Sequence, residues 1–242
     1  MIRETFNRII YNHYVMEEHI VKILDITPVT HDVKRFRVQK PAGYSFIPGQ
    51  ATEVSINKPE WKDEKRPFTF TALNSAPYLE FTIKTYPARK GVTSQLGTLT
   101  TGDELIIRDV WGAINYKGKG VFIAGGAGVT PFISILRDLN TKDQIKGNKL
   151  LFANKTKADI ILKDELQEML GDDFMNILSE EANGTDDGSN YARGLINIEF
   201  LKSNINDFNQ YFYVCGPDPM IQIVLKLLAE LGAREKSVVI EI

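Results

Sequence analysis

Ala124-Gly125-Gly126-Ala127-Gly128-Val129-Thr130-Pro131-Phe132 is the stretch that decides the fold, because it joins a strand to a helix through a turn almost without side chains. The apolar run 121–124 predicts a short buried strand, and the apolar residues of 132–139 have helical spacing. Thr130 predicts the N-cap of this helix and Pro131 its first residue. Free N–H groups at a helix start favour an anion, so the glycines predict a place where a diphosphate approaches the backbone.

This turn leaves an alternative open. A dinucleotide-binding turn of the usual kind carries a third glycine three positions after Gly128, and Pro131 stands there instead. An ordinary tight turn between a strand and a helix would also explain the stretch. The rest of the chain must decide between the two.

The composition is that of a soluble globular protein, with 43% hydrophobic and 25% charged residues. A chain of 242 residues favours two domains of about 100 to 130 residues each. Residues 1–115 carry 15 basic and 13 acidic side chains, whereas residues 116–242 carry 14 and 18. This asymmetry is too small for nucleic acid, but it is compatible with an acidic partner that docks on the first half.

A single cysteine, Cys215, excludes an internal disulfide, a cysteine-ligated iron–sulfur cluster and a multi-cysteine zinc site. His13, His19 and His31 lack metal-ligand spacing, so we expect no metal. No apolar run reaches the roughly 20 residues of a membrane span. The N-terminus has no apolar signal segment, and we therefore expect a cytoplasmic protein.

The first half of the chain predicts a small antiparallel β-barrel. Short strands punctuated by turn residues are typical of that fold. Residues 1–15 show no clear period and are expected to be an N-terminal extension, unless Met16 is the true start. Residues 16–115 form the expected barrel domain, with strands at 19–26, 32–39, 51–57, 67–72, 79–85 and 104–109 and a helix near 92–98.

Residues 116–242 predict a second domain with a doubly wound parallel sheet. Strands and helices alternate there, and the crevice at the C-terminal strand ends of such a sheet binds the ligand. The expected strands are 120–124, 149–153, 174–178, 210–215 and 237–241, and the expected helices are 131–140, 163–170, 195–202 and 218–231. The polar, glycine-rich segment 184–190 predicts a loop.

Three further stretches join the glycine turn in one pattern. Arg66-Pro67-Phe68-Thr69 begins a strand, where the ring and the hydroxyl would face opposite ways unless the strand bends. Gly91-Val92-Thr93-Ser94 opens the predicted barrel helix and is a second candidate anion site. Cys215-Gly216-Pro217 ends a strand before a helix.

In this order the four stretches resemble the ferredoxin–NADP reductase superfamily, over residues 17–242. The family pairs a flavin-binding barrel with a domain that binds a nicotinamide nucleotide. The resemblance implies that Arg66 grips the flavin phosphate, that Phe68 lies against the flavin ring and that Thr69 offers a hydroxyl near N5. The family motif has tyrosine and serine where this chain has Phe68 and Thr69.

The resemblance also implies the remaining site residues. Thr69, Cys215 and Glu241 would be catalytic, with Cys215 beside the nicotinamide and Glu241 in a terminal strand whose last residue, Ile242, is not the aromatic common in the family. The cofactor-binding set would be Arg66, Pro67, Phe68, Thr69, Ile83, Lys84, Thr85, Gly91, Val92, Thr93, Ser94, Gly125, Gly126, Gly128, Val129, Thr130, Pro131, Glu180, Cys215, Gly216 and Pro217.

The implied activity is flavin-dependent oxidation of NADH or NADPH, with FAD favoured over FMN. Electrons would pass to a separate acceptor such as ferredoxin or flavodoxin, a small carrier docking on the flavin domain. Carboxylates at Glu180 and Glu181 favour NADH, although Lys155 and Lys157 could serve a 2′-phosphate. The alternative is a regulatory or electron-transfer subunit that keeps the fold and a nucleotide without turnover. The acceptor and the oligomeric state do not follow from the sequence.

Overall fold

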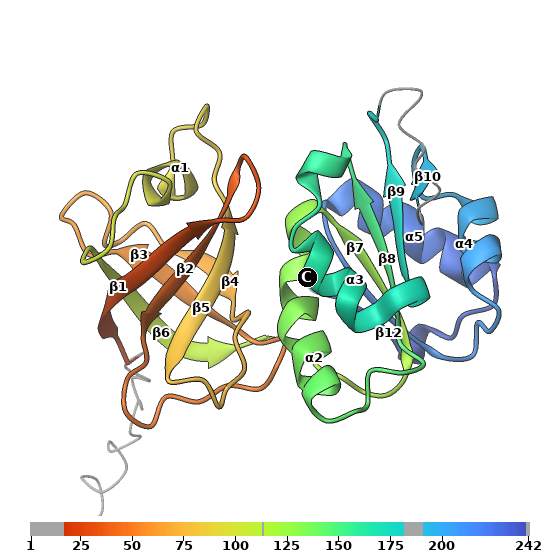
Figure 1. Cartoon of the computed structure of the whole chain (residues 1–242), viewed down its shortest axis with the longest axis horizontal. Helices are drawn as coiled ribbons and strands as arrows, with labels where there is room; N and C mark the ends of the chain where they lie inside the picture. The colour runs from red at the N-terminus through yellow and green to blue at the C-terminus, as the bar shows by residue number, and fades with distance from the viewer. Residues whose placement is uncertain (1–16, 113, 182–190, 241–242) are drawn as a thin grey trace, which may run out of the picture.

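The computed structural model describes residues 17–112, 114–181 and 191–240. Two sheets lie side by side, and helix α2 (Thr130–Thr141) lies between them (Figure 1). Among the described residues no helix is both long enough and apolar enough to cross a membrane.

The first sheet is an antiparallel barrel. Its strands within the described ranges are β1 (His19–Pro28), β2 (Val33–Gln39), β3 (Ala51–Ile56), β4 (Arg66–Thr69), β5 (Tyr78–Lys84) and β6 (Glu104–Trp111). They pair in the order β4-β3-β6-β1-β2-β5. An antiparallel bridge between Phe70 and Phe81 joins the two outer strands, so the sheet closes on itself. The five-residue helix α1 (Val92–Leu96) buries Val92 and Leu96 in the barrel core.

The second sheet is parallel throughout its described strands. These are β7 (Gly120–Gly125), β8 (Lys149–Asn154), β9 (Phe174–Leu178), β10 (Tyr191–Arg193), β11 (Tyr211–Cys215) and β12 (Val238–Ile240). The order is β10-β9-β8-β7-β11-β12, so the winding reverses between β7 and β11. In an open sheet of this kind the ligand crevice lies at the C-terminal ends of the strands on either side of that reversal.

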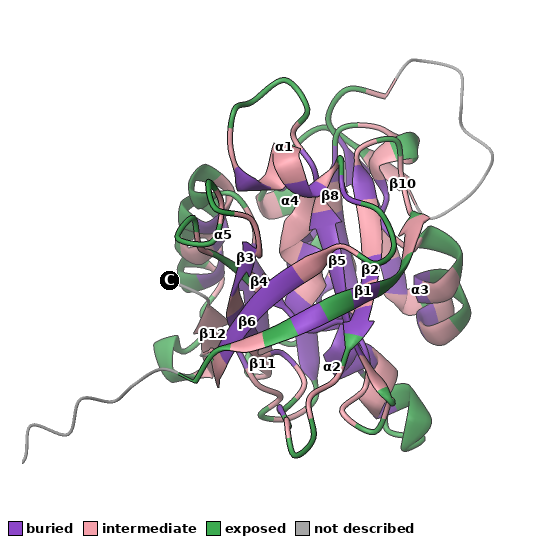
Figure 2. Ribbon diagram, turned by 90° about the vertical axis from the view of Figure 1, so that its left-hand side faces the viewer, coloured by how far each residue is buried: buried purple, intermediate pink, exposed green. Residues whose placement is uncertain are grey.

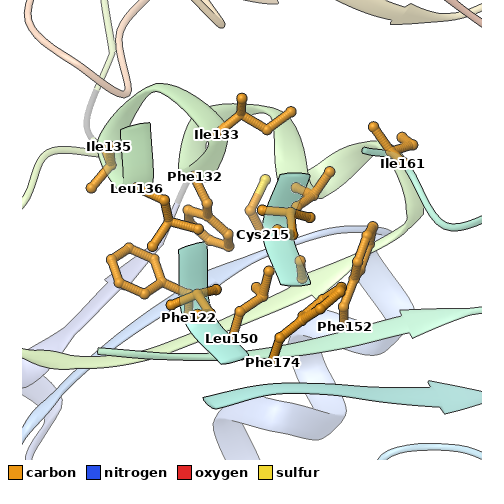
Figure 3. Packing of buried hydrophobic residues seen from close by; sticks show 14 of the residues in the cluster. Phe122, Phe132, Ile133, Ile135, Leu136, Leu150, Phe152, Ile161, Phe174 and Cys215 are labelled. Carbon is orange, nitrogen blue, oxygen red and sulfur yellow. The ribbon is translucent and has the colours of Figure 1, made fainter. Parts of the chain in front are cut away.

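Helices cover both faces of the parallel sheet. One apolar cluster packs α2 and α3 (Lys163–Leu170) against Phe122, Leu150 and Phe174 (Figure 3). The other packs α4 (Ile198–Asn204) and α5 (Asp218–Glu230) against the opposite face. Because helices cover both faces, the strands of this sheet are largely buried and the outer sides of the helices are exposed, purple and green in Figure 2. The predicted fold class, an antiparallel barrel followed by a doubly wound α/β unit, is confirmed.

Two local details differ from the sequence predictions. Strand β10 is only three residues long and was not predicted, because so short a run carries no periodicity. The helix predicted at 195–202 begins at Ile198, where the side chain of Asn197 accepts a hydrogen bond from the N–H of Phe200 at 2.8 Å. This is an N-cap contact, and it fixes the start of α4.

Candidate active site between the barrel and the parallel sheet

A cavity of about 250 Å³ lies where the barrel meets the parallel sheet, and we call it the inner cavity. Its lining comes from both halves of the chain: Ala51, Pro67, Phe68, Thr69, Thr82, Ile83, Lys84, Tyr86, Thr93, Ala127, Thr130 and Cys215. Pro67 and seven other predicted site residues line this cavity. The seven are Phe68, Thr69, Ile83, Lys84, Thr93, Thr130 and Cys215, and the chain separates the first from the last by 147 positions. They come from the short strand β4, the ends of β5 and β11, and the first turns of α1 and α2.

Phe68 and Thr69 line the same cavity although they are adjacent on β4. The alternation of a strand would send them to opposite sides, but Thr69 is the last residue of β4, where the regular strand ends. Thr69 is 8% exposed, and the described part of the chain gives its hydroxyl no hydrogen-bond partner. The hydroxyl is therefore available to a ligand in the cavity.

The stretch Gly91-Val92-Thr93-Ser94 contributes fewer cavity-lining residues than the resemblance implies. Thr93 lines the inner cavity, whereas Val92 is buried in the barrel core. Gly91 has extended backbone with φ of 168°, and a side chain there would meet nothing within 4 Å. Neither Gly91 nor Ser94 is among the cavity-lining residues.

Thr85 has a structural contact instead of a place in the cavity lining. Its side chain is buried, and both its hydroxyl and its N–H donate to the carbonyl oxygen of Asp32, at 3.0 and 2.7 Å. Thr85 thereby fixes the turn between β1 and β2. The two residues before it, Ile83 and Lys84, do line the inner cavity.

A second cavity of about 570 Å³, the outer cavity, opens at the C-terminal edge of the parallel sheet. It is lined by Lys84, Tyr86, Gly125, Gly126, Ala127, Gly128, Ala153, Asn154, Lys155, Asp159, Ser179, Gly194, Leu195, Gly216, Pro217 and Met220. Apart from Lys84 and Tyr86 of the barrel, these residues lie at or beyond the C-terminal ends of β7, β8, β9, β10 and β11, which places the cavity at the reversal of the winding. Lys84, Tyr86 and Ala127 line both cavities, so the two spaces meet.

The glycines of the central turn have two different roles. A side chain on Gly128 would lie 2.4 Å from the carbonyl oxygen of Cys215, and one on Gly125 would lie 2.5 Å from the sulfur of Met220. These two glycines let the turns after β7 and β11 touch. Gly126 instead has a φ of +51° and open space where a Cβ would stand, so its backbone faces the outer cavity.

The predicted N-cap role of Thr130 is wrong. A 3₁₀ turn, η1 (Gly126–Val129), precedes α2, and Thr130 is already the first residue of the α-helix. Its hydroxyl donates to the carbonyl oxygen of Ala127 at 2.9 Å, within that turn. The side chain therefore tightens the turn that separates the two cavities. Pro131, predicted as the first residue of the helix, is its second residue, and Val129 is buried.

Cys215 is the last residue of β11 and is 9% exposed. It belongs to the apolar cluster under α2 (Figure 3), and it also lines the inner cavity. Gly216 and Pro217 continue into the outer cavity, where a Cβ on Gly216 would meet Met220 at 2.7 Å. The thiol thus stands at the boundary between the apolar core and the cavity.

Lys84 is held at the junction of the cavities by an acidic neighbour. Its ammonium contacts Asp32 at 2.9 Å, and His31 lies 3.7 Å from Asp32 and 3.9 Å from Asp159. Burial alone would raise the pKa of Asp159, but hydrogen bonds from Thr156 and the charge of Lys84 hold that pKa below its ordinary value. The polar group therefore joins the β1–β2 turn of the barrel to the loop after β8.

Glu180 lies beside the outer cavity but does not line it. Its carboxylate contacts the ammonium of Lys155 at 2.9 Å, and Lys155 is a lining residue. This contact raises the pKa of Lys155. The other lysine that could serve a phosphate, Lys157, has its ammonium 4.6 Å from the ring centre of Tyr191.

Arg66 and Glu241 are also not among the residues that line either cavity. Arg66 is half exposed, and its guanidinium donates to the carbonyl oxygen of Lys65 at 2.6 Å and lies 3.7 Å from Glu64. Glu241 falls outside the described residues. Their expected roles stay predictions.

Sequence reasoning missed several lining residues of the outer cavity: Tyr86, Asn154, Asp159, Ser179, Gly194, Leu195 and Met220. Asn154, Ser179 and Gly194 stand at or directly after a strand end. The rule that ligands bind at these ends could have found Asn154 and Ser179, which close β8 and follow β9. Leu195 is 71% exposed and offers an apolar surface at the cavity.

Comparison with known proteins agrees with this architecture. A family model described as the oxidoreductase NAD-binding domain matches residues 122–226. The chain is 29% identical over 237 residues to the reductase component of propane 2-monooxygenase from Rhodococcus jostii, covering 90% of this chain and 61% of that protein. It is 27% identical to NADH-cytochrome b5 reductase 1 of Aspergillus terreus, covering 95% of this chain and 81% of that protein.

Solved structures share the fold. The ferredoxin NADP+ reductase of Neisseria gonorrhoeae with bound FAD and NADP aligns with a TM-score of 0.77 at 20% identity, covering 93% of this chain and 98% of that one. The chain therefore has the two-domain fold of these reductases. The chain spans about three fifths of the length of the propane 2-monooxygenase reductases that it matches.

Proposed function

We propose that this chain is a flavin-dependent NAD(P)H oxidoreductase, with FAD in the inner cavity and the nicotinamide nucleotide in the outer cavity. The observation that carries the proposal is that the two cavities meet at Lys84, Tyr86 and Ala127. A ring entering from each side would come into contact there. Residues 16–115 are the proposed flavin-binding domain, and residues 116–242 the proposed nucleotide-binding domain.

The lining of the inner cavity fits a flavin ring. Phe68 offers an aromatic face, Ala51 is small, and the Thr69 hydroxyl is available to a ring nitrogen. When bound, the flavin accepts the hydride that the nicotinamide gives up. The residues of this chain then orient the two rings and exclude water from between them.

The outer cavity fits a dinucleotide. Gly126 exposes its backbone without a side chain, at the start of the turn that leads into α2. N–H groups at such a position favour phosphate oxygens. Cys215 would lie beside the nicotinamide, because it lines the inner cavity while Gly216 and Pro217 line the outer one. We propose that Cys215 positions the nicotinamide and that Glu241 lines the same place.

The electron acceptor is proposed to be a separate protein, docking on the flavin domain. The single cysteine cannot ligate an iron–sulfur cluster within this chain. The relatives named as a monooxygenase reductase component and as cytochrome b5 reductases act with protein acceptors by their names. We propose an acceptor of that kind, a small electron carrier or an oxygenase component.

The absorption spectrum of the purified protein tests the function directly. We expect flavin bands that bleach on addition of NADH or NADPH under anaerobic conditions. Arg66→Ala should weaken flavin binding roughly ten- to a hundredfold, the effect of losing a charge-assisted contact of about 1.5 to 3 kcal/mol. A protein that binds flavin but is not reduced would be a binding subunit. One that retains no flavin under any condition would refute the proposal.

We propose that NADH is the preferred nucleotide. Glu180 and Lys155 neutralise each other at 2.9 Å, so Lys155 is not an unopposed cation for a 2′-phosphate. A carboxylate at this edge accepts hydrogen bonds from ribose hydroxyls and repels a phosphate.

The ratio of kcat/KM for NADH and NADPH measures this preference. Glu180→Arg should shift the ratio toward NADPH by about tenfold or more, since it replaces repulsion with attraction. Glu168→Arg on the exposed face of α3 makes the same change in charge away from the cavity and serves as the control. A tenfold preference of the parent for NADPH would contradict the assignment.

A further inference from the structure

One face of helix α2 contacts the barrel. Thr130, Ser134 and Arg137 are spaced by four and three positions, which places them on the same side of a helix. Thr130 lines the inner cavity at the start of α2. The two residues further along contact the barrel directly.

Ser134 makes the first of these contacts. Its hydroxyl oxygen accepts a hydrogen bond from the N–H of Gly49 at 3.0 Å, and Ser134 is fully buried. Gly49 belongs to the barrel loop that precedes β3. A buried hydrogen bond that would be lost without replacement is costly to break.

Arg137 makes the second contact, and both edges of its guanidinium are bonded. Nη1 donates to Glu80 Oε1 and to the carbonyl oxygen of Thr71, each at 2.7 Å, on the barrel. Nε and Nη2 donate to the two carboxylate oxygens of Glu165 on α3, at 2.5 and 2.8 Å. The planar guanidinium therefore fixes the barrel relative to two helices at once.

The barrel partner, Glu80, is itself part of the strand that forms the cavity wall. Its side chain is 2% exposed, and Arg37 of β2 also contacts it, at 3.1 Å. Two residues further along β5, Thr82 begins the run Thr82-Ile83-Lys84 that lines the inner cavity. The Arg137–Glu80 pair thus joins the helix that carries one wall of the cavity to the strand that carries the other.

We propose that Arg137, acting through Glu80, is a positioning residue that sets the separation of the two cavity walls and with it the distance for hydride transfer. This inference rests on the proposed function. A displacement of about 1 Å between reacting groups can slow a reaction by about a hundredfold. Glu80 also contacts Arg37 and lies 3.9 Å from Arg35, but both arginines are on β2 of the barrel, so Arg137 is the partner that joins Glu80 to α2.

Arg137→Gln and Glu80→Gln test the proposal by stopped-flow reduction of the flavin at saturating NADH. Each should slow reduction by about 10- to 100-fold while flavin content stays at the parental level. Arg37→Gln and Glu165→Gln are the matched controls, because each removes a partner from the same network without removing the contact between domains. The controls should change the rate by less than about threefold.

The primary isotope effect separates positioning from mere support of the fold. With NADH deuterated at the transferred position, Arg137→Gln should show a more temperature-dependent isotope effect than the parent, because the two rings are held less firmly. Arg137→Lys keeps the charge but not the planar fork, and it should fall between the two in rate. Arg137→Lys also replaces Arg137→Gln as the test variant if Arg137→Gln does not fold. A parental rate in Arg137→Gln, or an equal loss in the controls, overturns the proposal.

Hydrogen exchange of the flavin-free protein gives a readout that needs no activity. Arg137→Gln should speed exchange of the Gly49 amide by about tenfold or more, because that amide bonds across the same interface, and should leave the amides of β8 unchanged. Unchanged exchange at Gly49 overturns the proposal. If the parent is not reduced by NADH, the proposed function fails, and this measurement still decides whether Arg137 holds the interface.

Discussion

The two walls of the inner cavity differ in what they present to a ligand. The barrel wall presents side chains, among them Phe68, Thr69 and Lys84, at the ends of β4 and β5. The opposite wall presents Ala127, Thr130 and Cys215, and the turns that carry them touch each other at Gly128. The barrel wall can therefore change its chemistry by substitution, whereas the opposite wall is limited by the space between two turns.

Gly128→Ala should have the largest effect on stability. Its Cβ would meet the carbonyl oxygen of Cys215 at 2.4 Å and the Cα of Gly216 at 2.6 Å, and backbone atoms cannot rotate away. We expect the free energy of unfolding to fall by about 3 kcal/mol or more, the upper end for overpacking. Urea unfolding should show this as a lower midpoint. Gly126→Ala, which has open space, should lose only about 1 kcal/mol from its positive φ. Equal losses would mean that steric contact does not distinguish the two glycines.

Glu80→Gln tests how far the barrel wall depends on a buried charge. Burial opposes ionisation of Glu80, but Arg137, Arg37 and Thr71 more than offset it and hold its pKa below the ordinary 4.5. Replacement should cost about 1.5 to 3 kcal/mol at pH 7.

The pH dependence gives this prediction a sharper form. Since the pKa is lowered in the folded state, the ionised carboxylate stabilises the fold fully above about pH 4.5, and this contribution is lost as pH falls through the folded pKa. The difference in unfolding midpoint between the parent and Glu80→Gln should therefore shrink as the solution is acidified below pH 4.5. A difference that stays constant would contradict the assignment.

Thr69→Val should change chemistry more than stability. The hydroxyl has no hydrogen-bond partner in the described part of the chain, so the free energy of unfolding should change by no more than about 0.5 kcal/mol. Flavin reduction should slow about two- to tenfold, the value of one neutral hydrogen bond. Thr52→Val is the control, since the Thr52 hydroxyl donates to the carbonyl oxygen of Arg108 at 2.8 Å and Thr52 is not among the residues that line either cavity. It should lower stability by about 1 kcal/mol and leave the rate unchanged.

Gly91→Ala should have the smallest effect on stability, within about 0.5 kcal/mol. The backbone of Gly91 is extended and its surroundings are open. Gly128 and Gly91 are each followed by Val-Thr and precede a helix, so the pair compares a glycine required by close packing with one in open surroundings. A loss for Gly91→Ala comparable to that of Gly128→Ala would remove the contrast.

The resemblance of four motifs singled out the candidate site residues, and the local strand pattern placed several of them at the ends of predictable elements. Phe68, Lys84 and Cys215 each stand at or next to the end of a strand whose pattern is local. Roles that depend on contact were less predictable. Thr130 was expected to cap α2, but a 3₁₀ turn precedes the helix and its hydroxyl bonds to Ala127 instead.

The sequence by itself determined the barrel, the parallel sheet and the order of the four motifs, because apolar period and turn residues act over a few positions. Only the tertiary structure decided which glycines are required by close packing. It also joined Arg137 to Glu80 and Ser134 to Gly49, across 57 and 85 positions. Such contacts depend on how α2 packs against the barrel, and no local pattern records that packing.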